Sequence, residues 1–222
     1  MKSSTKPSLQ APRLPKNLSS DLPATLETQG EYAAVAWNNA QFIQQTASHV
    51  VWEKASLRRV AFSQSRLPHA RFTDVRLEAC DFSGVNLEKA LLRRTEVRGC
   101  RWLGTQLMEA RVEDVLFHEG NYEGAVFAMT AFKNTRFENC RLVHASFEGV
   151  DLSGAMLVDC DLTQVDFRGA KLNGADLRGS LINNLIVGPR ELQGVIIEPA
   201  QAVQMAGLLG LVVKERDEPL DV

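Results

Sequence analysis

The amino-acid sequence predicts an all-β solenoid in which the chain turns a corner every five residues, so that four sides close one coil of 20 residues. Three observations predict it: a large apolar residue at nearly every fifth position, glycine at a fixed place after it, and opposite charges at a spacing of 20. A period of five fits neither an amphipathic helix nor an alternating strand, whose periods are about 3.6 and 2. An internal repeat of this kind determines the fold before any other feature of the sequence.

Large apolar residues keep one register from residue 52 to residue 182. All 15 aromatic residues of the chain (3 Trp, 2 Tyr and 10 Phe) fall on this position, and a small residue such as Ala55 or Cys80 stands two residues before it. We expect both positions to point inward and the other three to point to solvent. Successive coils then stack at the strand spacing of about 4.8 Å.

Glycine marks the corners of the coil. Ten of the 15 glycines lie two residues after the large position, as Gly84 and Gly174 do. A type II turn requires a residue with positive φ, which glycine adopts without steric cost. The corners are therefore predicted at this position.

Charged side chains support the coil length of 20. Between residues 51 and 200, 15 pairs of charged residues at this spacing have opposite sign and none has like sign. One column alternates through Lys54, Asp74, Arg94 and Asp114. Stacked strand neighbours favour opposite charges by about 0.2–1 kcal/mol each, so the pattern indicates a regular four-sided coil.

The repeat resembles the pentapeptide-repeat family, whose motif is A(D/N)LXX. The best matches are Ala170-Lys171-Leu172-Asn173-Gly174 and Ala175-Asp176-Leu177-Arg178-Gly179, and the resemblance covers about two thirds of the chain. It implies a right-handed quadrilateral β-helix with a short C-terminal capping helix. The C-terminus is also loosely similar to the branch of the family that protects DNA gyrase from quinolones, in which this segment joins two coils into a dimer.

Four segments are expected along the chain. Residues 1–29 are rich in Ser, Pro and Lys and are expected to be a flexible tail, partly disordered. They carry no apolar run for a secretory signal or a membrane span, so we expect a cytoplasmic protein. Residues 30–50 are expected to form an irregular first coil or an N-terminal cap, and residues 51–197 the regular β-helix.

Residues 198–222 are expected to form a helix, a short strand at Leu211-Val212-Val213 and a charged tail. Proline near the start and glycine at the end are helix punctuation. In the expected helix, Val203, Ala206 and Leu209 face the last coil. This orientation leaves a candidate interface for a homodimer, made of Met205, Leu208 and Leu211.

Residues capable of catalysis or metal binding have simpler roles in this register. The four cysteines, Cys80, Cys100, Cys140 and Cys160, take the small inward position and are read as core filler rather than a metal or redox site. The four histidines point outward without an evident third ligand. A regular coil offers no cleft that would shift the pKa of a carboxylate, so we predict no enzyme activity, no metal and no cofactor.

Two functions are consistent with this pattern. The first is a non-catalytic protein-interaction or scaffold module whose protein partner is unknown. A net charge of −2 gives no strong attraction to nucleic acid or a membrane. The alternative is a DNA-mimic modulator of DNA gyrase or topoisomerase that confers quinolone protection, although a mimic needs rows of like charge. Its candidate partner-binding residues are Glu109, Glu113, Asp114, Glu119 and Glu123.

Overall fold

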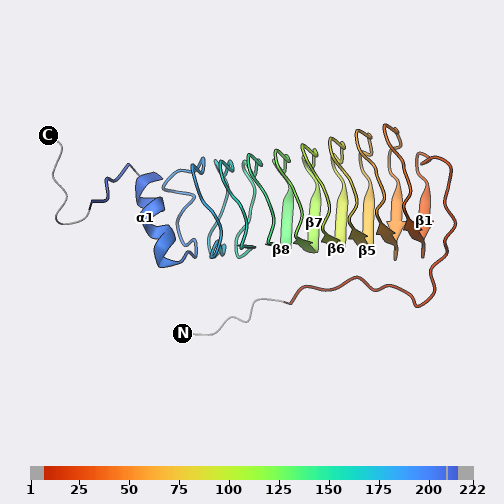
Figure 1. The fold of residues 1–222 in the computed structure, drawn as a ribbon, viewed down its shortest axis with the longest axis horizontal. Coiled ribbons are helices and arrows are strands. Elements are labelled where there is room, and N and C mark those ends of the chain that lie inside the picture. The colour runs from red at the N-terminus through yellow and green to blue at the C-terminus, as the bar shows by residue number, and fades with distance from the viewer. Residues whose placement is uncertain (1–7, 209, 215–222) are drawn as a thin grey trace.

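The protein is a parallel β-solenoid closed at its C-terminal end by one helix, in a computed structural model that describes residues 8–208 and 210–214 (Figure 1). Every strand pair is parallel and joins residues 20 apart, as Tyr32↔Trp52 and Phe137↔Leu157 do, which confirms the predicted coil. β2 (Ala36–Asn38) pairs with β4 (Ser56–Arg58), which pairs in turn with β5. The main sheet runs through β1 (Glu31–Ala33), β3 (Val51–Glu53), β5 (Arg71–Glu78), β6 (Leu91–Arg98), β7 (Arg111–His118), β8 (Ala131–Glu138) and β9 (Met156–Val158).

The core is a single cluster of large side chains that runs through all the coils, which confirms the predicted inward register. Trp102, Phe117 and Phe137 have no exposed surface, and the rings of Phe117 and Phe137 stack with their centroids 4.5 Å apart. Phe132 is an exception, because it is only partly buried. Phe132 is in the first half of the eight-residue strand β8. The next coil contacts this half only through an isolated bridge between Ala131 and Asp151.

The corners adopt the left-handed backbone conformation that the glycine pattern predicts. The ten glycines at the corner position have φ between 59° and 75°. Other residues adopt the same conformation at corners without glycine, including His69 (φ 60°) and Asp74 (φ 57°). The coil geometry therefore imposes positive φ on ordinary residues, against their intrinsic preference.

The N-terminal end differs from the expectation. Residues 30–50 follow the regular register, and residues 19–29 form the cap over the first coil. Leu26 is buried, its N–H donates to Gln45 Oε1 at 2.7 Å, and Trp37 Nε1 donates to the carbonyl oxygen of Asp21 at 2.7 Å. Gln45, a polar residue at a small inward position, is thus used to hold the cap.

Residues 8–18, called the N-terminal strap here, run along the side of the solenoid past β5, β6, β7 and β8 (Figure 1). Residues 8–29 of the expected flexible tail lie against the coils. The rest of that expected tail, residues 1–7, lies outside the described residues.

The C-terminal helix α1 (Pro199–Leu208) covers the last coil in the opposite orientation to the one expected. Gln201 and Met205 are buried, whereas Val203 is 56% exposed. The reason is polar: Gln201 Nε2 donates to the carbonyl oxygens of Leu177 (2.8 Å) and Ser180 (2.7 Å), which the coil end leaves without strand partners.

The segment after α1 also departs from the expectation. Residues 211–213 form no strand and are 56–80% exposed. Leu209, expected to face the last coil, and residues 215–222 of the expected charged tail lie outside the described residues.

Candidate functional site

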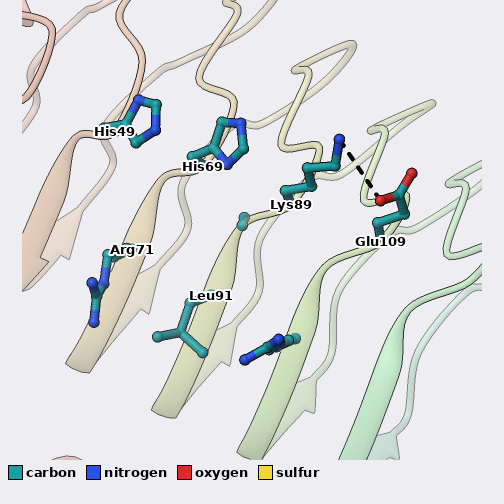
Figure 2. A pocket seen from close by; sticks show the side chains of 8 residues that line it. His49, His69, Arg71, Lys89, Leu91 and Glu109 are labelled. Atoms are coloured by element: carbon teal, nitrogen blue, oxygen red, sulfur yellow. Dashed lines mark ion pairs between the residues drawn. The ribbon is translucent and has the colours of Figure 1, made fainter.

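A shallow groove of about 540 Å³ follows one corner of the solenoid over its first coils (Figure 2). It lies between a column of corner side chains and the first residues of β5, β6 and β7. We call it the cationic groove, and it is lined by His49, His69, Arg71, Lys89, Ala90, Leu91, Glu109 and Arg111.

The corner side of the cationic groove is a column of stacked polar side chains. Positive φ at every member of the column, from 57° to 60°, directs these side chains outward in register. The rings of His49 and His69 stack with centroids 4.5 Å apart and an interplanar angle of 6°. Lys89 Nζ lies 3.7 Å from Glu109 Oε2 and 3.2 Å from Glu88, and hydrogen bonding to Glu88, then the charge of Glu109, raises the pKa of Lys89.

The strand side of the groove carries two arginines, Arg71 and Arg111. Arg71 pairs in register with Leu91, and Leu91 with Arg111, so an apolar residue separates the two guanidinium groups. Within residues 8–208 and 210–214, neither arginine has an ion-pair partner within 4.0 Å. Figure 2 shows Arg71 and Leu91 on the strand side of the groove.

Most charge columns elsewhere form the ladders that the sequence predicts. Ion pairs within 4.0 Å join nine of the 15 opposite-charge neighbours at a spacing of 20: Arg58–Glu78, Asp74–Arg94, Arg76–Glu96, Asp81–Arg101, Lys89–Glu109, Arg93–Glu113, Glu113–Lys133, Arg141–Asp161 and Asp151–Lys171. The arginines of the groove depart from this pattern, as do Arg13, Arg59, Arg66 and Arg190, which also have no ion pair within 4.0 Å in the described part of the chain.

The five acidic residues considered for a DNA mimic do not form a row of free carboxylates. They are spread over different sides of the coils, and each has a positive or hydrogen-bonding neighbour. The closest neighbours are Lys89 for Glu109, Lys133 for Glu113, Asn134 for Asp114, His118 for Glu119 and Arg141 for Glu123.

The cysteine column behaves as core. All four thiols are free and buried, and Cys100 Sγ accepts a hydrogen bond from Cys80 N at 3.3 Å. Gly120 interrupts the column because a Cβ atom there would lie 2.5 Å from the ring of Tyr122. In the described part of the chain, no group of three or more His, Cys, Asp or Glu residues could hold a metal ion.

Comparison with known proteins agrees with this architecture. A model described as a pentapeptide repeat region matches residues 70–147, and a model of eight pentapeptide repeats matches residues 38–74, 130–169 and 145–184. The chain belongs to the pentapeptide-repeat family. Together these family matches extend over residues 38–184, which are the regular coils.

A solved structure of the family shares the fold at low sequence identity. A trypsin-treated form of QnrB1, a plasmid-mediated fluoroquinolone resistance protein, is 20% identical, with a TM-score of 0.60 over 89% of this chain and 97% of that one. HetL, involved in heterocyst differentiation regulation in the cyanobacterium Nostoc, is 19% identical, with a TM-score of 0.31 over 77% of this chain and 90% of that one. No curated protein sequence matches significantly. No helix in residues 8–208 and 210–214 has the length and apolar character to cross a membrane.

Sequence reasoning missed the cationic groove, although a signal was present. In the column Arg71, Leu91, Arg111, charge does not alternate as it does in the neighbouring columns. The missing carboxylate at position 91 is the feature that marks the groove.

Proposed function

We propose that this pentapeptide-repeat protein is a non-catalytic protein-interaction module and that the cationic groove binds an acidic segment of a protein partner. The observation that carries the proposal is the pair Arg71 and Arg111, neither of which has an ion-pair partner within 4.0 Å among residues 8–208 and 210–214, beside charge ladders in which nine of 15 expected pairs form. Guanidinium groups bind carboxylates through two parallel hydrogen bonds, so an acidic segment supplies the missing partners.

The spacing of the groove suggests the conformation of this segment. The two arginines lie two strands apart, which is about 9.6 Å at the usual strand spacing. A polyproline II chain rises about 3.1 Å per residue with three residues per turn, so side chains three residues apart lie on one face about 9.3 Å apart. An acidic residue at every third position therefore reaches both arginines, and the intervening turn lies over Leu91.

A non-catalytic role is supported by the state of the titratable groups in the cationic groove. Lys89 and Glu109 neutralise each other, and the two histidines stack on one another at the surface. We also propose a cytoplasmic location, which suits a protein with four buried free thiols.

A direct test uses fluorescence anisotropy with a labelled peptide of Pro-Pro-Glu repeats. The unchanged protein should bind it in a salt-dependent manner, and the double substitution Arg71→Ala with Arg111→Ala should weaken binding at least tenfold. The matched control is Arg58→Ala with Arg98→Ala, two arginines at the same spacing that are separated by Glu78; its affinity should stay within about twofold.

Two outcomes contradict the proposal. One is equal binding of a Pro-Pro-Gln peptide, since the carboxylates would then contribute nothing. The other is dose-dependent inhibition of gyrase supercoiling by the protein at low micromolar concentration, unaffected by the arginine substitutions. That result would favour the DNA-mimic function, which the paired acidic residues give no reason to expect.

A further inference from the structure

The N-terminal strap lies over a second column of side chains, at the corner in the middle of β5, β6, β7 and β8. We call it the Asp74 column, and it consists of Asp74, Arg94, Asp114 and Asn134. Three hydrogen bonds join the strap to this column: Arg13 N donates to Asp74 Oδ1 (3.0 Å), Gln10 N donates to Asp114 Oδ1 (3.4 Å), and Asn134 Nδ2 donates to the carbonyl oxygen of Ser8 (3.2 Å).

The strap matches the repeat of the solenoid. Its two N–H donors, on Gln10 and Arg13, are three residues apart, while their acceptors on Asp74 and Asp114 are two coils apart. Three residues of polyproline II advance about 9.3 Å and return to the same face, and two coils advance about 9.6 Å. Pro12 lies between the donors, where no N–H is required.

The Asp74 column holds its acceptors in place through contacts within the solenoid. Arg94 donates from Nε and Nη2 to the two oxygens of Asp74 at 2.7 and 2.6 Å, and the two side chains are only 12% and 5% exposed. Hydrogen bonding to Arg94 is the main cause that lowers the pKa of Asp74, and the Arg13 N–H lowers it further. The Asp74 carboxylate is therefore ionised and oriented by its own coil neighbour, with an acceptor left for an N–H from outside.

The strap is recognised through its backbone more than through its polar side chains. Gln10 and Arg13 are exposed, whereas Leu9, Pro12 and Leu14 are half-buried. A ligand of this site therefore needs an extended, proline-containing chain with free N–H groups three residues apart. It also needs apolar side chains at the positions that correspond to Leu9, Pro12 and Leu14.

We propose that the Asp74 column is a binding site for an extended, proline-containing segment of a partner protein, and that the strap occupies this site as a competing segment of the same chain. The strap is the template for the ligand, because its contacts use groups that any peptide of the same pattern presents. Its tether gives it a high effective concentration, so a peptide in solution competes with it poorly until the strap is loosened. This site lies at the next corner of the coil after the one that bounds the cationic groove, and it does not depend on that groove's function.

The experiment measures binding of a fluorescent peptide with the sequence of residues 8–18 to the full-length chain by anisotropy. The substitutions Gln10→Pro and Arg13→Pro in the protein's own strap remove both N–H donors and leave the solenoid unchanged. This variant should bind the peptide at least tenfold more tightly than the unchanged protein does. A peptide carrying the same two prolines should not bind the strap variant more tightly than it binds the unchanged protein.

The control is a variant with Ala24→Pro, which adds a proline to the N-terminal region outside the strap and should leave peptide affinity near that of the unchanged protein. Equal affinity of the strap variant and the unchanged protein would overturn the proposal. Undiminished binding of the proline-substituted peptide would overturn it as well, because the N–H donors would then not be recognised. Because the peptide and its proline-substituted form are compared on one folded protein, the result does not depend on a variant of the solenoid.

Discussion

Truncation of Phe137 should remove a large part of the stability of the middle coils. The side chain has no exposed surface, and its ring contacts those of Phe117, Tyr122, Phe127 and Phe147 at centroid distances of 4.5, 6.0, 5.9 and 5.8 Å. Truncation of a buried phenylalanine to alanine costs about 3–5 kcal/mol. We expect the cost of Phe137→Ala to lie at the upper end of this range. Ladder hydrogen bonds hold the coils at a fixed spacing, so the coils cannot collapse into the cavity that the substitution leaves.

Two neighbouring substitutions calibrate this prediction. Phe132→Ala should cost less than Phe137→Ala, because Phe132 is only partly buried. Lys133→Ala should cost less than about 1 kcal/mol: its side chain is 76% exposed, and its ion pair with Glu113 is at the surface.

Urea denaturation followed by far-ultraviolet circular dichroism measures all three variants, with the combined fluorescence of Trp37, Trp52 and Trp102, which lie on the N-terminal side of residue 137, as a second probe. Midpoints are compared at a common slope, because a changed slope indicates that coils unfold separately. Equal losses for Phe137→Ala and Lys133→Ala would refute the inward and outward register. A larger loss at Phe132 than at Phe137 would refute the argument from burial.

Four further predictions concern three single substitutions and the oligomeric state. Tyr122→Phe should leave the free energy of unfolding unchanged or raise it by about 1 kcal/mol, measured by urea denaturation, because the buried hydroxyl has no hydrogen-bond partner among residues 8–208 and 210–214. Gly120→Ala should lower it by about 1–3 kcal/mol in the same assay, since the added Cβ meets the Tyr122 ring. Asp74→Asn should lower it by about 1.5–3 kcal/mol at pH 7, a moderate loss because Asp114 stays beside Arg94. Hydrogen bonding to Arg94 lowers the folded-state pKa of Asp74 in spite of burial, so the difference from the unchanged protein should shrink as the pH falls below about 4. The chain should form a dimer through its C-terminal segment, and because Met205 is buried, Leu211→Asp with Val212→Asp should make it monomeric in light scattering.

The regular coils could be predicted from sequence because each of their determinants repeats. Inward register, corner position and charge columns depend on contacts at a fixed spacing of 20, so every coil provides a further instance of the same pattern. The strap provides no such repetition. Its contacts join residues 61 to 126 positions apart through backbone N–H and carbonyl groups, which leave no mark on the choice of side chains.

The orientation of the C-terminal helix shows a different limit. Apolar residues occur on more than one side of α1, so hydrophobicity alone could not select the buried face. The carbonyl oxygens at the end of the last coil require donors, and Gln201 provides them from the face that also carries Met205. The sequence argument considered only apolar contacts and therefore chose the wrong face.

The alternating charge columns also restrict how the length of this chain can change during evolution. Loss of one coil would bring residues 40 positions apart into contact, and these have the same sign in several columns: Lys54 with Arg94, Arg58 with Arg98, Asp74 with Asp114, and Arg93 with Lys133. Each such contact replaces a favourable neighbour by a repulsive one, at about 0.2–1 kcal/mol. Loss or duplication of two coils preserves every alternation. Descendants of this sequence should therefore differ in length by an even number of coils, in steps of about 9.6 Å along the solenoid axis.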